Sequence, residues 1–303
     1  MKKILITLIL IIVAINLFAY SLEGKYDWTK PTKRIYPGID LASVALEDPF
    51  VNVYCVKIDL KQGFKFYTTP PLTEEENFKI DERETWKETT RTFMRNFQNS
   101  KRQMLVAINA DFFRPWPPKN ASDPAWLVGM AVSEGKLVSV GHGEPCFVWK
   151  KDGTVSLDIC DENYDISNVM CAVAGNSFFL FDGTYRGGDA YRLPRTCLGV
   201  SLDHHYMYWM VVDGRRHRSE GMSMEDCAKA MLYFGAAHAI NLDGGGSSTM
   251  CFWDRVSNDD DKCKLINEPN QGEYRKGTLK SEDAKFKVGE RKVANNLGVY
   301  IDL

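Results

Sequence analysis

The chain has 303 residues, of which 44% are hydrophobic and 26% are charged, and its formal net charge at pH 7 is −2. These proportions are ordinary for a globular protein. A net charge so close to zero supplies no basic field for a phosphate backbone, so we exclude nucleic acid as an expected partner.

The N-terminus, "MKKILITLILIIVAINLFAY", has the layout of a secretory signal peptide. Two lysines precede an apolar run, and Ala19 supplies a small residue for cleavage. We therefore expect a signal peptide at 1–19 and a periplasmic or secreted mature chain at 20–303. An uncleaved membrane anchor stays open as an alternative, because Leu17 and Ala19 match an A-x-A site only approximately.

The mature chain is long enough for one large domain or two small ones, and we expect one. Its eight cysteines are scattered and include no C-x-x-C pair that would indicate a zinc or redox site. An oxidising compartment would permit disulfide bonds, but the sequence does not assign their pairs. The cysteines are Cys55, Cys146, Cys160, Cys171, Cys197, Cys227, Cys251 and Cys263.

The first third of the mature chain combines strand and helix patterns. Prolines and charges at 24–44 indicate an irregular lead-in, and two alternating apolar runs at 51–60 and 64–69 predict a hairpin. Apolar residues at helical spacing predict an amphipathic helix over 82–98 that packs on a sheet. Its packed face would consist of Trp86, Thr90, Phe93 and Phe97.

The middle of the chain is rich in strand signals. Residues 103–113 predict a buried strand, and the four prolines of 114–126 predict a long loop of the kind that often builds sites. Three later segments each contain two apolar runs around a turn, which predicts antiparallel hairpins. These hairpins are expected at 130–140, 145–159 and 197–215.

The last third contains one clear helix signal. Ser223 and Asp226 have near capping-box spacing and Gly235 supplies a C-terminal stop, which predicts a helix of about three turns. The strand "HAINLD" follows it, and the polar segment 254–290 is expected to be a charged, mobile surface excursion. The chain closes with a buried strand in "RKVANNLGVYIDL".

Together these elements predict an α+β fold with mixed, largely antiparallel β-sheets and packed helices in a single domain. Several apolar strands end in polar residues that ordinary hairpins do not need. Such positions on a rigid scaffold commonly hold binding and catalytic groups. The set comprises Asn109, Asp111, Arg195, Thr196, Asp213, Arg215, Asp243, Ser247, Ser248 and Asn296.

The stretch "NLDGGGSSTM" places three consecutive glycines after an acid at the end of a strand. Glycine serves where the backbone must take a positive φ or approach a ligand closely. A loop that exposes successive N–H groups can bind an anion. The stretch lacks the lysine of a P-loop and the spacing of a dinucleotide fingerprint or a nucleophile elbow, which weakens nucleotide and esterase interpretations.

Five blocks in order resemble the phosphodiester glycosidase family, and they cover roughly 105–300. The blocks are "INADFF", "PRTCLGV", "VVDGR", "GMSMEDCAKAMLYFGAAHAINLDGGGSSTM" and "RKVANNLGVY". The resemblance implies hydrolysis at the anomeric carbon of a sugar joined through phosphate to a second alcohol. The products would be a free sugar and a phosphomonoester.

The resemblance also carries residues over by position. Arg195 and Thr196 correspond to the family's "PRT", and Asp213 and Arg215 correspond to its "DGR". The family's "DGGGSS" corresponds to Asp243, Gly244, Gly245, Gly246, Ser247 and Ser248. Asn109 opens the family's "NxxFF" block, whereas Asp111 lies where members vary, so its candidacy rests on this sequence alone.

Departure of a phosphomonoester leaves positive charge on the sugar ring and negative charge on the phosphate. A carboxylate near the ring can stabilise that cation, act as a nucleophile or activate water, and Asp243 is the first candidate before Asp213. Arg195 or Arg215, with the amides of the glycine loop, would stabilise the phosphate. The expected partner is a small molecule or glycan that carries a sugar-1-phosphodiester.

Two other functions stay open. A non-catalytic sugar-phosphate binding protein of the cell envelope would use the same cleft without turnover. A metal-dependent phosphodiesterase would hold a divalent ion with Asp111, Asp213 and Asp243. The histidines lack metal-ligand spacing, so the glycosidase interpretation includes neither a metal site nor a cofactor.

Overall fold

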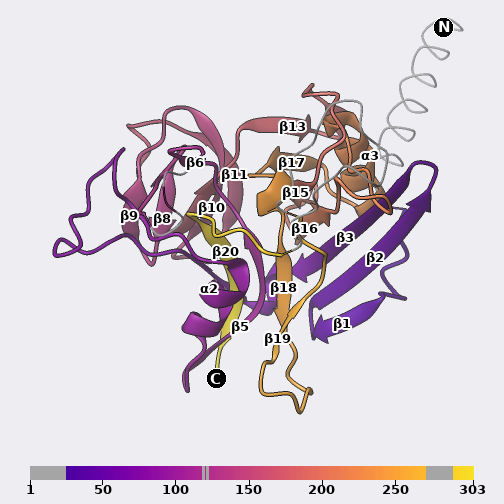
Figure 1. Cartoon of the computed structure of the whole chain (residues 1–303), viewed down its shortest axis with the longest axis horizontal. Helices are drawn as coiled ribbons and strands as arrows, with labels where there is room; N and C mark the ends of the chain where they lie inside the picture. Colours follow the sequence, from indigo (N-terminus) through magenta and orange to yellow (C-terminus); the bar gives the residue numbers. More distant parts are fainter. Residues whose placement is uncertain (1–24, 118–119, 121–122, 271–288) are drawn as a thin grey trace, which may run out of the picture.

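The computed structural model describes residues 25–117, 120, 123–270 and 289–303 (Figure 1). The predicted signal peptide and residues 271–288 of the predicted charged excursion lie outside the described residues. No helix in the described part of the chain is long and apolar enough to cross a membrane.

Three large β-sheets and a two-stranded ribbon make up the described fold, and the described strand pairs are antiparallel. In spatial order, the eight-stranded sheet contains β1 (Lys33–Tyr36), β2 (Ile39–Glu47), β3 (Phe50–Asp59), β16 (Tyr206–Val212), β15 (Arg195–Val200), β17 (His238–Asn241), β13 (Ser177–Phe181) and β14 (Thr184–Tyr185).

Each of the two smaller sheets has five strands. One contains β11 (Val155–Cys160), β10 (Glu144–Lys150), β12 (Val169–Ala174), β8 (Ala131–Ser133) and β9 (Lys136–Ser139). The other contains β19 (Cys263–Leu265), β18 (Met250–Trp253), β5 (Arg102–Asn109), β20 (Asn296–Asp302) and β4 (Lys65–Thr68). The ribbon pairs β6 (Phe113–Arg114) with β7 (Trp126–Leu127).

One hydrophobic cluster joins the three large sheets, and Phe66 lies at their meeting point. Its ring on β4 is 5.2 Å from the ring of Phe147 on β10 and 6.2 Å from that of Trp209 on β16, measured between centroids. These three side chains are almost entirely buried. A core shared in this way is what a single domain requires, because no sheet buries its inner face alone.

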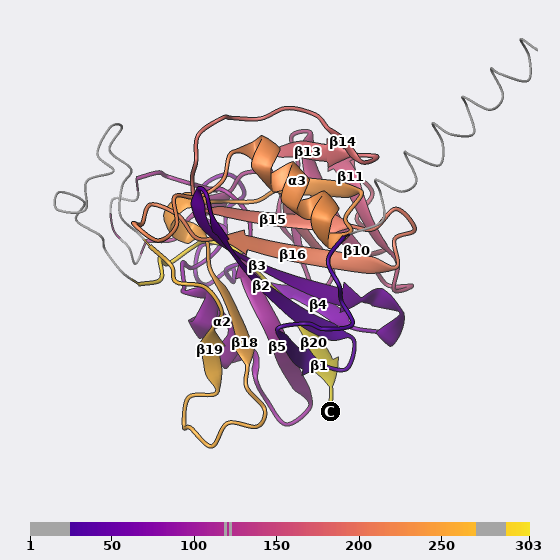
Figure 2. The same cartoon turned by 90° about the vertical axis from the view of Figure 1, so that its right-hand side faces the viewer.

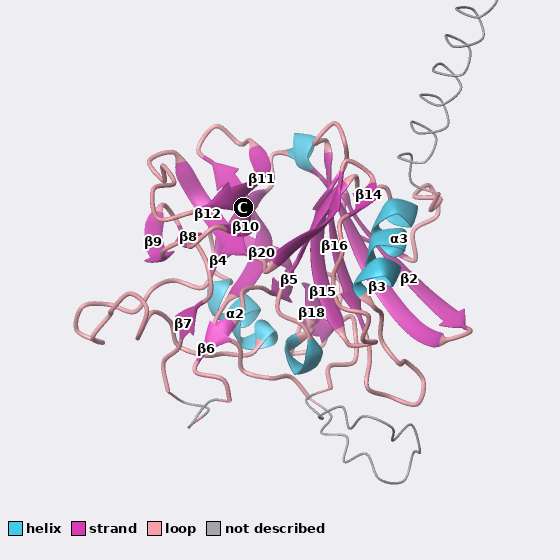
Figure 3. Ribbon diagram, turned by 90° about the horizontal axis from the view of Figure 1, so that it is seen from above, coloured by secondary structure: helices cyan, strands magenta, loops and turns pink. Residues whose placement is uncertain are grey.

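Helix α3 (Met224–Phe234) covers the opposite face of the eight-stranded sheet, away from the other two sheets (Figures 2 and 3). The predicted cap is present: Ser223 Oγ accepts a hydrogen bond from Asp226 N–H, and the Asp226 carboxylate accepts one from Ser223 N–H. Gly235 ends the helix as predicted. The buried side chains of the helix are Met224, Cys227, Ala228, Met231 and Phe234.

The predicted fold class is wrong in its helical part. The described chain has two packed α-helices, α2 (Thr90–Phe97) and α3, beside 20 strands, so the fold is predominantly antiparallel β rather than α+β. Two segments, 82–98 and 223–235, carry helical patterns in the sequence. Only one of them forms a helix along most of its length.

The helix predicted at 82–98 forms only in its second half, where α2 spans Thr90–Phe97. Before it, the backbones of Thr85 and Glu88 pair with distant segments in isolated bridges. Trp86, which was expected on the packed face, is 44% exposed. Tertiary pairing therefore overrides a helical pattern that has no N-cap until Thr89.

The predicted hairpin of the first two apolar runs is also wrong. Both runs are strands, but β3 lies between β2 and β16, whereas β4 pairs with β20. A 3-10 turn at Leu60–Gln62 separates them and sends β4 into another sheet. The expected irregular lead-in instead contains β1 and most of β2, which form a hairpin.

Other local predictions are confirmed. The three hairpins form as β8–β9, β10–β11 and β15–β16, and β20 closes the chain as a largely buried strand. The predicted charged excursion is partly wrong, because its described part contains β19 and the buried side chains of Asn267 and Asn270.

The capping box of α3 gives a stability prediction. Replacing Ser223 with alanine leaves helix N–H groups without their acceptor, and it should lower the free energy of unfolding by about 1 kcal/mol. Chemical denaturation measures the change. Lys229→Ala, on the exposed side of the same helix, should change it by less than about 0.5 kcal/mol. Equal losses in the two variants would contradict the capping role.

Candidate active site

The buried side chain of Asn109, at the end of β5, joins three of the recognised sequence blocks. Its Nδ2 donates to the carbonyl oxygen of Asp243 at 2.6 Å. Its Oδ1 accepts from Thr196 Oγ1 at 2.8 Å and from the N–H of Thr249 at 3.0 Å. Asn109 and Thr196, both predicted as site residues, thus fix the backbone of the loop that carries Asp243.

The glycine loop is a tight turn rather than an open nest of N–H groups. Residues Gly245–Ser247 form a 3-10 turn. Four N–H groups of the loop donate to backbone carbonyls: Asp243 to Ala110, Gly245 to Pro194, Ser247 to Gly244 and Ser248 to Gly245. The prediction that successive loop amides cradle an anion is therefore not supported by this geometry.

Close packing explains why the loop needs glycine. A Cβ on Gly244 would lie 2.9 Å from the carbonyl oxygen of Pro194. Gly245 has a φ of +63°, and a Cβ there would lie 3.0 Å from Nη2 of Arg215. Side chains at these positions would push away the start of β15 or the guanidinium of Arg215.

Asp243 is half-buried beside cationic groups. Burial raises the pKa of its carboxyl to about 6, although the Ser247 hydroxyl, the Arg291 guanidinium, the Gly244 N–H and the Arg215 guanidinium all act in the opposite direction. The Ser247 hydroxyl hydrogen-bonds the carboxyl and accepts from Arg291 Nη1 at 3.3 Å. The site therefore brings one acid, one hydroxyl and two guanidinium groups together.

Arg291 and Trp116 are site residues that sequence reasoning missed. The guanidinium carbon of Arg291 lies 4.3 Å from the ring centroid of Trp116, whose side chain is 46% exposed. Glu290 accepts from Arg91 Nε at 2.5 Å, which anchors the segment in front of Arg291. The signals were present, since Arg291 opens the last recognised block and Trp116 lies in the proline-rich loop.

Asp213 is buried at the end of β16 and is already hydrogen-bonded. Its Oδ1 accepts from Asn267 Nδ2 at 3.0 Å and from the N–H of Glu268 at 3.2 Å. Burial raises the pKa of Asp213 to about 6, and the Asn267 amide is the strongest influence in the opposite direction. Asp213 thus holds the segment that follows β19.

That segment in turn supports the glycine loop and Arg215. Asn267 Nδ2 donates to the carbonyl oxygen of Ser248 at 3.1 Å, and Asn270 Nδ2 donates to that of Arg215 at 2.9 Å. Arg215 itself has a φ of +58°. Neither asparagine stood out in the sequence, because both lie in a polar stretch.

Arg195 is 5% exposed, and its guanidinium is occupied by protein partners. Nη1 and Nη2 donate to the two carboxylate oxygens of Asp189, at 3.0 and 2.6 Å. Nε donates to the carbonyl oxygen of Met222 at 3.0 Å, and Nη2 also donates to that of Tyr191 at 2.7 Å. These contacts make Arg195 an anchor for the loop in front of β15.

Asp111 and Asn296 are fully buried behind the loop. The Asp111 carboxylate accepts from the N–H of Ala174 and from Nδ2 of Asn295, both at 2.7 Å. Burial raises the pKa of Asp111 well above its usual range. Asn296 Oδ1 accepts from Thr90 Oγ1 at 2.8 Å. The structure therefore does not bring these two side chains to the group around Asp243.

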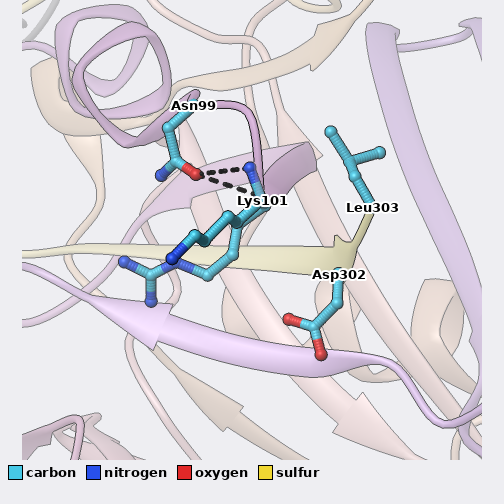
Figure 4. A pocket seen from close by; sticks show the side chains of 5 residues that line it. Asn99, Lys101, Asp302 and Leu303 are labelled. Carbon is cyan, nitrogen blue, oxygen red and sulfur yellow. Dashed lines mark hydrogen bonds between the residues drawn. The ribbon is translucent and has the colours of Figure 1, made fainter.

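The acids proposed for a metal ion have separate sets of partners. Within the described ranges, no three histidine, cysteine or acidic side chains are grouped as ligands. A surface hollow lies elsewhere, where β5 begins and β20 ends (Figure 4). It is lined by Asn99, Lys101, Arg102, Asp302 and Leu303. Asn109 and Asn296 lie at the other ends of these two strands, so the hollow is remote from the glycine loop.

Solved structures share this architecture. The catalytic domain of zebrafish N-acetylglucosamine-1-phosphodiester alpha-N-acetylglucosaminidase, auto-inhibited by its pro-peptide, superposes with a TM-score of 0.61 at 18% identity, over 91% of this chain and 86% of that one. A Burkholderia pseudomallei protein predicted to be exported gives 0.54 at 15% identity, over 82% and 74%.

A hypothetical protein from Synechocystis gives a TM-score of 0.54 at 12% identity, over 87% of this chain and 62% of that one. At such identities the likeness concerns the fold. None of the curated protein sequences compared with the chain matches it significantly.

The family assignment rests on the sequence model of the phosphodiester glycosidases. That model matches residues 102–300, which is well over half of the chain. The match includes Asn109, Thr196, Asp213, Asp243 and Arg291, whereas Arg91 and most of the residues that line the remote hollow lie outside it. The chain therefore belongs to the phosphodiester glycosidase family.

Proposed function

We propose that the protein is a hydrolase that cleaves a sugar-1-phosphodiester into a free sugar and a phosphomonoester. The observation that carries this proposal is the half-buried carboxyl of Asp243 beside the guanidinium groups of Arg215 and Arg291. One acid with two adjacent cations suits a reaction in which positive charge develops on the sugar ring and negative charge on the departing phosphate. A site selected only to bind an anion would gain from losing the acid.

Asp243 acts on the sugar side of the scissile bond in this proposal. Its carboxylate stabilises positive charge at the anomeric carbon, either directly, as a nucleophile, or by activating water. The oxygen of water ends on that carbon, and the bond to the phosphate oxygen breaks. A pKa of about 6 keeps the group largely ionised at neutral pH, which is the form that each of these roles needs.

Arg215 and Arg291 act on the phosphate side. Their fixed charges neutralise the phosphomonoester as it departs, so the leaving group needs no strong acid. This proposal changes two of the roles that were assigned from the sequence. Arg195 and Asp213 become positioning residues, because their polar atoms bind Asp189 and the segment after β19.

Trp116 provides the surface for the sugar ring. Arg291 stacks on its indole, and much of the side chain stays exposed next to the phosphate side of the site. An aromatic face packs well against the C–H groups of a pyranose, whose burial is favourable. Export to the periplasm or beyond remains part of the proposal, on the basis of the N-terminal sequence.

Product analysis in water enriched in oxygen-18 tests the reaction directly. Incubation with a panel of sugar-1-phosphodiesters should yield free sugar labelled at the anomeric oxygen and an unlabelled phosphomonoester. Label in the phosphate would mean P–O cleavage and would favour a phosphodiesterase. Binding of the substrates without any product would favour the sugar-phosphate binding protein.

Asp243→Asn should fold normally but lower kcat by at least about a hundredfold, as expected when a positioned acid or base is removed. In the unmodified protein, kcat/KM should fall as the pH drops below about 6, because Asp243 then takes up a proton. The residual activity of the variant should lack this acid limb. A variant that turns over normally would remove Asp243 from the reaction.

The same carboxyl predicts how stability depends on pH. Its pKa of about 6 in the folded chain lies above the value of about 3.9 for an exposed aspartate, so the folded state binds the proton more tightly. Stability should therefore fall as the pH rises from about 4 to about 6. Asp243→Asn should weaken this dependence, which thermal unfolding at several pH values measures.

Gly245→Ala separates backbone strain from the role of Arg215. The substitution places a Cβ in a left-handed conformation and against Arg215 Nη2. It should cost about 1 kcal/mol of stability and also weaken binding of a phosphomonoester. Gly63→Ala is the matched control, because its φ is +73° and nothing lies within 4 Å of the added Cβ.

Both glycine variants should lose similar stability, but only Gly245→Ala should lose phosphomonoester affinity, measured by calorimetry. Equal affinities in the two variants would show that the position of Arg215 does not matter for anion binding.

Trp116→Ala should raise KM with a smaller effect on kcat, because it removes a surface that binds the sugar in ground state and transition state alike. Phe181→Ala is a suitable control. Its exposed ring also carries an arginine, Arg186 at 5.6 Å, but it lies on β13 away from the glycine loop. Steady-state kinetics with one substrate should distinguish the variants. Equal KM values would contradict the role of Trp116 in binding the sugar.

A further inference from the structure

Six of the eight cysteines form three contacting pairs of buried thiols. Cys146 on β10 hydrogen-bonds Cys160 on β11 through the side chains. In the register of these strands, Cys146 faces Asp158 and Cys160 faces Glu144, so the two cysteines are diagonal neighbours on one face of the sheet. Both are fully buried in the same hydrophobic cluster.

The second pair repeats this arrangement in another sheet. Cys251 on β18 hydrogen-bonds Cys263 on β19. Cys251 faces Leu265 and Trp253 faces Cys263, so the thiols again lie diagonally on one face. Diagonal neighbours in an antiparallel pair lie about 7–8 Å apart, with their Cβ atoms somewhat closer.

The third pair joins a helix to a sheet. Cys227 on α3 hydrogen-bonds Cys197 on β15, and both are fully buried in one cluster. Each of the three pairs therefore links two different elements. In two of the pairs, one cysteine lies on a strand at the edge of its sheet: Cys160 on β11 and Cys263 on β19.

The remaining cysteines, Cys55 and Cys171, lie in different hydrophobic clusters. Cys55 shares a cluster with Cys197, but Met210 on β16 lies between them in register. Two strand spacings amount to about 9–10 Å, beyond the Cα separation of about 7 Å that a disulfide bridges. The two cysteines have no role in the pairing below.

We infer that the three contacting pairs are oxidised to disulfides when the chain folds in an oxidising compartment: Cys146–Cys160, Cys197–Cys227 and Cys251–Cys263. With only eight cysteines in the chain, three contacts between elements point to positions built for pairing. All eight are thiols in the structure. Bond formation brings the two sulfurs to about 2.05 Å and the Cα atoms within about 7 Å, which requires side-chain rotation and a shift of the backbone.

Each bridge forms by thiol–disulfide exchange. Two thiols lose two protons and two electrons, one S–S bond forms, and an external protein or glutathione disulfide is reduced to two thiols. The folded chain buries all eight sulfurs, which keeps external disulfides from reaching them. Pairing must therefore take place during folding. The bridges fasten β11, β19 and α3 to the sheets on which they pack.

Cell-free synthesis of the full chain tests this inference without relying on export. One sample folds in a glutathione redox buffer with a disulfide isomerase, and a second folds under reducing conditions. Each is then denatured and alkylated without reduction, and its peptides are identified by mass spectrometry. We expect six protected cysteines in the first sample, alkylation of Cys55 and Cys171, and three linked peptide pairs. All eight should be alkylated in the second sample.

Variants test the individual pairs. Cys263→Ser should make Cys251 available for alkylation and leave four cysteines protected, whereas Cys55→Ser should leave all six protected. The oxidised protein should also unfold at a higher temperature than the reduced protein. Complete alkylation of the oxidised sample, or links between other cysteines, would overturn the inference, and alkylation of both members of one pair would overturn that bridge.

Discussion

The site depends on the carboxamide of Asn109. This buried group donates to the backbone of Asp243 and accepts from Thr196 and Thr249, so it fastens the end of β5 to the glycine loop and to β15. Only an amide side chain offers a donor and an acceptor in this arrangement, because an ionised aspartate only accepts. Loss of one partner would leave buried polar atoms unpaired, which is costly. The loop geometry follows from this constraint.

The same loop shows how close packing creates a place for charge. Glycine at 244 and 245 lets Pro194 and Arg215 approach the backbone, and this approach sets Arg215 near the Asp243 carboxyl. Asp213 and Asp243 both have a pKa of about 6, but their hydrogen-bond partners differ. Asp213 binds a neighbouring segment, whereas Asp243 lies in the group with Ser247 and the arginines. Equal pKa values therefore accompany different roles.

Local sequence patterns predicted elements whose stabilisation is local. The hairpin turns and the capping box at Ser223 act within a few residues, and the corresponding elements formed as expected. Strand partners were not predictable in the same way. The runs that became β3 and β4 carry equivalent alternating patterns, yet they belong to different sheets because Phe66 packs where three sheets meet. The helical pattern of 82–89 does not form a helix, because Thr85 and Glu88 pair with distant backbone segments.

The sequence by itself determined the family, the order of its blocks and the acid at the head of the glycine run, because these are properties of consecutive residues. Tertiary structure decided which polar residues gather. Arg195 lies in a recognised motif, but its guanidinium binds Asp189. Arg291, from a distant segment, contacts Ser247 of the loop, and Trp116 packs on Arg291. The type of a side chain fixes its hydrogen-bond donors and its charge. Its partners depend on tertiary packing, which the spacing of residues along the sequence does not reveal.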